Sequence, residues 1–157
     1  MHSNSRSFNI NMAYFEIGVF HPRSNDNIGT LWRTAYQLGA AGIFTIGRAY
    51  RQQTSDTQHA AYEIPLRTYS SLEDFLANRP NGAQLIGIEM GGQPLAGFNH
   101  PERAIYLLGS ETMGLPEHVL QQCQAVIGLE SIRYPSYNLA VAGSIVLYHR
   151  VFIAGKS

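Results

Sequence analysis

Apolar and polar residues follow two periodicities along this chain. Short runs rich in β-branched and aromatic residues are typical of buried strands, and such runs occupy residues 14–20, 42–47, 66–69, 83–88, 104–108 and 125–129. Between most of these runs, apolar residues recur every three or four positions, as in helices that pack one face on a core. Strands that alternate with helices predict an α/β fold, in which a largely parallel sheet is flanked by helices.

Each of the helices expected before the last strand begins at a residue that favours a helix N-terminus. Asparagine and serine side chains accept hydrogen bonds from backbone N–H groups that lack a partner inside the helix, and proline fits the first helical position. The sequence predicts helices over 28–38 after an Asn27 cap, from a capping box of Ser70 and Glu73 to residue 78, and from Pro116 to about residue 124.

The last expected helix is unusual because it follows a polar turn and is rich in small residues. The turn is Pro135-Ser-Tyr-Asn138, and the helix continues to Tyr148. Small side chains allow a ligand or another backbone to approach closely. A polar turn that leads into such a helix predicts a binding site. The expected buried stripe of this helix is Leu139, Ala142, Gly143, Val146 and Leu147.

The length of 157 residues fits one domain with a sizeable core. Residues 1–12 are polar and unpatterned, so we expect a disordered leader before a single domain over 13–157. No apolar run approaches the roughly 20 residues of a membrane-spanning helix. The single cysteine, Cys123, excludes an internal disulfide. We therefore expect a cytoplasmic protein.

Charge and motif content limit the kinds of binding and catalysis that this sequence can support. The formal net charge of zero argues against nucleic-acid binding through overall basicity. All basic residues but Lys156 are arginines, which can contact phosphate through two parallel hydrogen bonds. The six histidines show no paired ligand spacing, so no metal is expected. Neither a P-loop nor a Rossmann glycine pattern is present, and no Gly-x-Ser-x-Gly elbow suggests a hydrolase.

Three polar segments each follow a predicted strand: Asn27-x-Gly-x-x-x-Arg33, Gly109-Ser-Glu-Thr-Met-Gly-Leu-Pro116 and Ser136-Tyr-Asn138. Ligands of open parallel sheets bind beyond the carboxyl ends of the strands. We therefore expect the three segments to converge on one end of the sheet.

In this order and spacing, the three segments resemble the motifs of the SpoU/TrmH family of RNA ribose 2′-O-methyltransferases, in the SPOUT superfamily. The resemblance covers about 14–152. It implies a SPOUT-like domain with a deep C-terminal trefoil knot and S-adenosylmethionine as methyl donor, leaving S-adenosylhomocysteine, without a metal. The family usually has Ile-Pro-Met before its third motif, where this chain has Ile127-Gly-Leu129.

The resemblance also assigns residues. It implies catalytic roles for Arg33, Asn27, Glu111, Ser136 and Asn138. It implies cofactor contacts for Glu89, Met90, Gly109, Ile127, Gly128, Leu129, Ser136, Asn138 and Leu139. The family's arginine has been regarded as a base. Because arginine hardly deprotonates in proteins, we favour a phosphate clamp for Arg33.

Partners are implied by the resemblance as well. Family members form homodimers through helices next to the knot, and the apolar residues Val141, Ile145, Tyr148 and Phe152 are candidates for that interface or for the core. The absence of an added RNA-binding domain is similar to small members that modify tRNA, with rRNA as the alternative substrate. Two other hypotheses stay open: a non-catalytic RNA- or nucleotide-binding module with this fold, and a flavodoxin-like nucleotide-binding protein.

Overall fold

The computed structural model describes residues 14–50 and 63–154, and its centre is a six-stranded, fully parallel sheet. The strand order is β3-β2-β1-β5-β4-β6. The strands are β1 (Tyr14–Phe20), β2 (Gly42–Ile46), β3 (Leu66–Tyr69), β4 (Gln84–Pro94), β5 (Arg103–Leu108) and β6 (Ala125–Gly128). The predicted α/β fold with a parallel sheet is confirmed.

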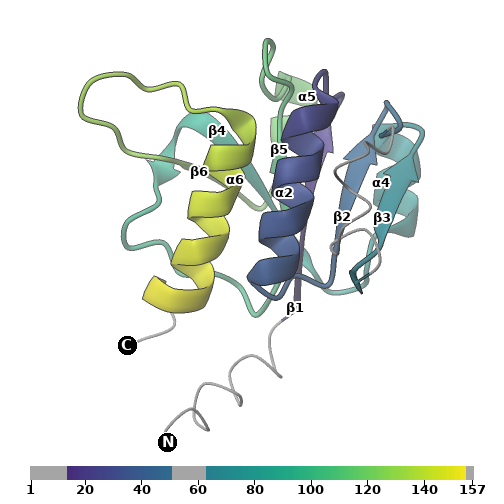
Figure 1. The fold of residues 1–157 in the computed structure, drawn as a ribbon, viewed down its shortest axis with the longest axis horizontal. Helices are drawn as coiled ribbons and strands as arrows, with labels where there is room; N and C mark the ends of the chain where they lie inside the picture. The colour runs from purple at the N-terminus through teal and green to yellow at the C-terminus, as the bar shows by residue number, and fades with distance from the viewer. Residues whose placement is uncertain (1–13, 51–62, 155–157) are drawn as a thin grey trace, which may run out of the picture.

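Helices cover both faces of this sheet (Figure 1). The helices are α2 (Asn25–Gln37), α4 (Leu72–Asn78), α5 (Glu117–Leu120) and α6 (Leu139–Tyr148), and α6 continues into a π-helical turn, η2 (His149–Ile153). Helices α2 and α6 pack side by side on one face and enclose one apolar cluster. Helices α4 and α5 contribute to a second cluster on the other face.

The predicted stripe of α6 is buried along its whole length. Gly143 lies in close contact with α2 and β1, since a Cβ atom there would lie 2.7 Å from Cδ1 of Leu31 on α2 and 3.1 Å from Cδ1 of Ile17 on β1. Absence of a side chain therefore lets α6 lie close to both α2 and the sheet.

Strand β4 differs from its prediction. The sequence predicts a strand that stops at Ile88 before a glycine loop, but the strand continues to Pro94. The register on β6 breaks between Ile88 and Gln93, so residues 89–92 leave the ladder and return to it. A Cβ atom on Gly92 would lie within 2.6–2.9 Å of the Ile127 backbone. Only glycine allows the strand to rejoin its neighbour this closely.

Two helix starts differ from their predictions by a few residues. Helix α2 is capped by Ser24, whose Oγ accepts the N–H of Asn27 at 3.1 Å, so Asn27 lies inside the helix and is not its cap. Helix α4 is capped by Ser71 with Asp74 in place of Ser70 with Glu73. In both places several adjacent residues can act as caps, and the tertiary structure selects one. Helix α5 ends at Leu120, earlier than expected.

Some expectations are not tested by this structure. The leader over 1–12 lies outside the described residues, and the knot stays a prediction. Within the described ranges, no helix is both long and apolar enough to cross a bilayer.

Candidate functional site

The three polar segments meet at the carboxyl edge of the sheet, as expected. They follow β1, β5 and β6, whose ends lie at one edge because all strands run in the same direction. Together they border a pocket of about 550 Å³. Its lining is Asn27, Ile88–Met90, Leu108–Gly114, Leu129, Pro135–Leu139 and Ala142.

Glu111 joins the first two segments. Its carboxylate accepts the backbone N–H groups of Arg23 at 2.9 Å and Ser24 at 3.0 Å, and the side-chain amide of Asn27 at 3.1 Å. Burial by itself raises the pKa of this carboxyl, but the hydrogen bonds outweigh burial and hold the pKa below its ordinary value. Glu111 therefore carries its charge as a structural acceptor near the start of α2.

Asn138 joins the third segment to the other two. Its Oδ1 caps α6 by accepting the N–H of Val141 at 3.1 Å, which leaves its Nδ2 to donate to Oδ1 of Asn27 at 3.0 Å. The amide of Asn27 then donates to Glu111. Each amide uses its oxygen as acceptor and its nitrogen as donor, so the helix cap determines the orientation of the whole chain of bonds.

Seven of the nine residues assigned to the cofactor by resemblance line the pocket: Glu89, Met90, Gly109, Leu129, Ser136, Asn138 and Leu139. Ile127 and Gly128 do not. Ile127 is fully buried, and Gly128 lies against the backbone of Glu89 and Gly92.

Glu89 is a second pocket carboxylate in a different environment. One backbone N–H, that of Leu115, reaches it at 3.4 Å. Burial raises the pKa of Glu89 above its ordinary value, and the hydrogen bond from Leu115 opposes this rise only in part. The pocket thus holds one carboxylate that is strongly satisfied, Glu111, and one with spare acceptor capacity, Glu89.

Arg33 is the one assigned catalytic residue that the structure does not bring to the pocket. It lies on α2 six residues after Asn27, which is about 9 Å further along the helix axis. Its side chain is exposed and has no hydrogen-bond partner among the described residues. The other four assigned residues, Asn27, Glu111, Ser136 and Asn138, line the pocket together.

Sequence reasoning missed two supporting side chains. Arg48, just after β2, donates from Nη1 to the carbonyls of Pro22 at 3.1 Å and Arg23 at 2.9 Å. Arg48 therefore binds the carbonyl groups of the same turn after β1 whose N–H groups bind Glu111. Tyr137 donates its hydroxyl to the carbonyl of Glu130 at 2.6 Å. Two features of the sequence could have indicated these roles: Arg48 follows a strand end, and Tyr137 lies inside the third polar segment.

No group of three histidine, cysteine, aspartate or glutamate side chains that could hold a metal ion occurs in the parts of the chain that the structure describes. The expectation of a metal-free site stays a prediction.

Comparison with known families gives one match to most of the chain. The family model described as the SpoU rRNA Methylase family matches residues 14–148. Among curated proteins, the chain is 29% identical over 134 residues to tRNA (guanosine(18)-2′-O)-methyltransferase TARBP1 from Mus musculus. It is 26% identical over 128 residues to an uncharacterised tRNA/rRNA methyltransferase from Archaeoglobus fulgidus. Both matches cover 78% of this chain, but only 8% and 57% of the relatives' own lengths.

Solved structures share the fold. A structure described as giving insight into 2-OH methylation of C/U34 on tRNA is 25% identical with a TM-score of 0.79, and the match covers 92% of this chain and 99% of that one. The SpoU methyltransferase AviRb from Streptomyces viridochromogenes, in complex with AdoMet, is 24% identical with a TM-score of 0.79, and the match covers 89% of this chain and 57% of that one.

The contacts of Glu111 predict a pH-dependent effect on stability. Glu111→Gln removes the charge that three donors share, and we expect the free energy of unfolding to fall by about 1 kcal/mol at neutral pH, a modest value because the carboxylate is partly exposed. Since the folded-state pKa lies below the ordinary value, this stabilisation is present above the ordinary carboxyl pKa and is lost as pH falls through the folded-state pKa.

Urea unfolding of both proteins between neutral and acidic pH measures this difference. The gap between wild type and variant should close at low pH. A gap that is the same at every pH would contradict a charge-based role for Glu111.

Proposed function

Because this chain belongs to the SpoU rRNA methylase family, we propose that it transfers a methyl group from S-adenosylmethionine to a ribose 2′-hydroxyl of RNA. The observation that carries the proposal is the pocket at the carboxyl edge of the sheet, where the three segments meet. Both curated relatives are methyltransferases of tRNA or rRNA, as their names state.

The pocket residues fit such a cofactor. A volume of about 550 Å³ lies within the range of small-molecule sites. Apolar side chains of Ile88, Leu108 and Leu139 form one part of the lining, suited to an adenine ring. Glu89, which receives one long hydrogen bond, has acceptor capacity left for hydroxyl or amino groups. S-Adenosylmethionine supplies a methyl group already activated on a sulfonium sulfur.

For the substrate we propose tRNA, with rRNA as the alternative. The support is the similarity to the structure described with C/U34 of tRNA, since that match covers nearly the full length of both chains. The protein would act in the cytoplasm, where these RNAs are found.

In the proposed reaction, the chain's own residues position the RNA so that its ribose oxygen takes up the methyl group, and the proton of the 2′-hydroxyl passes to water. Arg33 binds a phosphate next to the target ribose through its planar guanidinium. Asn27, Ser136 and Glu111 shape the site around the hydroxyl. Positioning of this kind accounts for large rate effects without a covalent step.

The distance of Arg33 from the pocket is explained if two copies of the chain cooperate. Helices α2 and α6 border an apolar groove of about 580 Å³, and Thr30 and Gln37, one turn before and after Arg33, line it. The exposed apolar side chains beside it are Val141, Ile145, Tyr148, Phe152 and Ile153. Core packing within one chain does not explain them, because all are at least 38% exposed, and Tyr148 is 52% exposed.

We propose that a second copy packs on this groove and that Arg33 of one copy acts on RNA bound at the pocket of the other. The proposal agrees with the threaded C-terminal segment that the family resemblance implies, since α6 belongs to that segment.

Cofactor binding is the first test. We expect S-adenosylmethionine and S-adenosylhomocysteine to bind at one site per chain in a calorimetric titration. Gly109→Ala should weaken both by at least about tenfold, because the new Cβ atom would lie 2.1 Å from the Gly114 carbonyl carbon and displace the pocket loop.

Gly42→Ala is the matched control. Gly42 begins β2, at the end of the sheet away from the pocket, and the nearest atom to its new Cβ would lie 3.3 Å away. It should bind the cofactor as wild type does. A folded wild-type protein that binds neither compound, with or without RNA, would contradict the methyltransferase proposal and favour the non-catalytic RNA-binding module.

The role of Arg33 is tested by Arg33→Lys. If a two-pronged clamp aligns the hydroxyl, lysine restores the charge but not the geometry, and kcat for RNA methylation should fall by about 100-fold with unchanged cofactor affinity. Transfer of labelled methyl groups to separated tRNA and rRNA, followed by nucleoside mass spectrometry, measures the rate and identifies the substrate class.

Arg103→Lys changes an exposed arginine at the amino end of β5 and should leave the rate unchanged. Near-normal turnover by Arg33→Lys would contradict the clamp. Methylation of a base in place of ribose would contradict the proposed reaction.

The dimer is tested by Ile145→Glu, which places a charge in the groove. We expect light scattering to show one chain in place of two, RNA methylation to fall strongly, and cofactor binding to persist. Thr68→Glu adds the same charge on the exposed edge strand β3 and should leave the dimer intact. A wild-type protein that is already a single chain would exclude this arrangement.

A further inference from the structure

The loop between β6 and α6 carries an exposed apolar tip that the pocket does not use. Residues 130–138 are all exposed, and Figure 1 shows this loop projecting away from the sheet and helices. At its tip, Ile132 is 96% exposed and Tyr134 is 73% exposed, with Arg133 between them. We call residues 132–134 the tip. Two large apolar side chains held in water next to a pocket indicate a binding surface.

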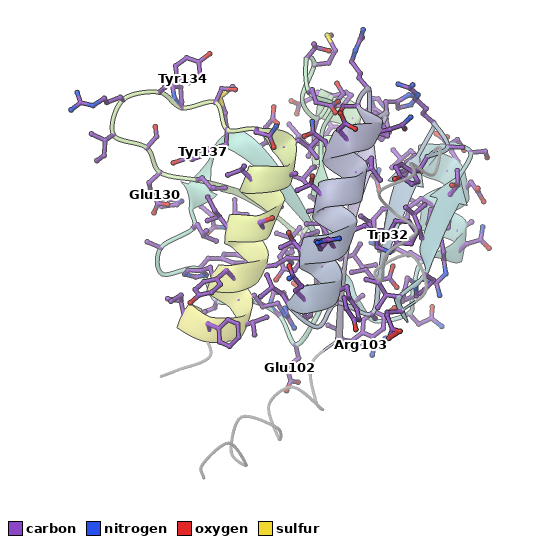
Figure 2. The ribbon with its side chains drawn as sticks, in the orientation of Figure 1. Trp32, Glu102, Arg103, Glu130, Tyr134 and Tyr137 are labelled. Carbon is purple, nitrogen blue, oxygen red and sulfur yellow. The ribbon has the colours of Figure 1, made fainter. Side chains whose placement is uncertain are left out.

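The loop is held in place at its base. The Tyr137 hydroxyl donates to the carbonyl of Glu130 at 2.6 Å, which closes the loop across its two limbs. The Glu130 carboxylate accepts the N–H of Ala96 at 3.0 Å and so anchors one limb to the segment after β4. Figure 2 shows Glu130 and Tyr137 on the two limbs and Tyr134 on the outer edge. The tip is therefore presented in a defined position.

The tip lies directly beside the pocket. Pro135, the residue after Tyr134, lines the pocket, as do Ser136 and Asn138 of the same loop. Met113, another exposed apolar residue, lines the same pocket. The tip is therefore within reach of an RNA whose ribose enters the pocket.

The chemistry of the tip fits one kind of ligand. An aromatic ring and an aliphatic side chain offer flat apolar contact, and the arginine between them offers a phosphate contact. Unpaired RNA bases expose a flat face to such side chains, whereas the bases of a duplex are stacked on one another. A chain with zero net charge also needs contacts other than overall basicity to hold RNA.

We propose that the tip binds an unpaired base next to the target ribose, with Tyr134 stacked on the base and Arg133 on a neighbouring phosphate. This inference rests on the proposed function and specifies its substrate: a nucleotide in a single-stranded loop or end of an RNA. The tip sets which part of an RNA can place its ribose in the pocket.

Fluorescence anisotropy with two labelled RNAs tests the proposal. One probe is a hairpin with a large unpaired loop, and the other is a fully paired duplex of similar length. For the hairpin, Tyr134→Leu should weaken binding by at least about fivefold, because leucine keeps apolar contact but has no ring to stack. Tyr134→Phe should stay within about twofold of wild type. Neither variant should change the affinity for the duplex or for S-adenosylmethionine.

Arg133 has a separate signature. Arg133→Gln should reduce the slope of log affinity against log salt concentration by about 0.7, the value for one phosphate contact with a single strand. Tyr134→Leu should leave that slope unchanged. Tyr36→Leu is the matched control for Tyr134→Leu and should bind both RNAs as wild type does. It removes another exposed tyrosine, at the carboxyl end of α2, away from the pocket.

Hairpin binding by Tyr134→Leu that equals wild type would overturn the proposal, and so would an equal loss for hairpin and duplex. A change in the mass of the assembly with Tyr134→Leu would show that the tip contacts a second copy of the chain instead. If wild type binds S-adenosylmethionine and methylates RNA while Tyr134→Leu is unaffected, this inference fails and the proposed function stands. Failure of wild type to bind either RNA overturns both.

Discussion

A chain of hydrogen bonds from Asn138 through Asn27 to Glu111 holds the site together. Its members come from segments after three different strands, and 111 positions separate the two asparagines. The chain of bonds can form only because all strands of the sheet are parallel, which places their carboxyl ends at one edge. The cap of α6 orients the first amide, and every later donor and acceptor follows from that orientation. The pocket wall and the start of both α2 and α6 therefore depend on one another.

The two pocket carboxylates show how environment divides roles between residues of the same chemical type. Glu111 accepts three hydrogen bonds, so the pKa of its carboxyl lies below the ordinary value and its oxygens are occupied. Glu89 receives one long hydrogen bond, and burial raises its pKa. We therefore expect a ligand to gain more from Glu89, because a partly buried acceptor with few partners is costly until a donor reaches it.

Helix α6 has two distinct apolar faces. One face is buried against α2 and the sheet, where Gly143 permits close contact. The other face, with Ile145 and Tyr148, is exposed beside the groove. A helix that is apolar on all sides needs a partner for each side. Among the residues that the structure describes, only the first side has a partner, which is the physical basis for the proposed second copy and for the proposed action of Arg33 at another pocket.

The sequence by itself determined the succession of strands and helices along the chain, because burial on both faces of a parallel sheet leaves apolar runs that are easily recognised. It also determined that Asn27, Glu111, Ser136 and Asn138 follow strands, and hence their meeting at one edge. The local pattern predicted the wrong cap for α2, Asn27 in place of Ser24. Either side chain can cap a helix, but the side chain of Asn27 is hydrogen-bonded to Glu111 and Asn138 instead. The local pattern also did not reveal that Arg33 lies outside the pocket, that β4 pairs with β6 again after Gly92, or that the side chain of Tyr134 is exposed to solvent. These features depend on contacts between segments far apart in the chain, which no local periodicity encodes.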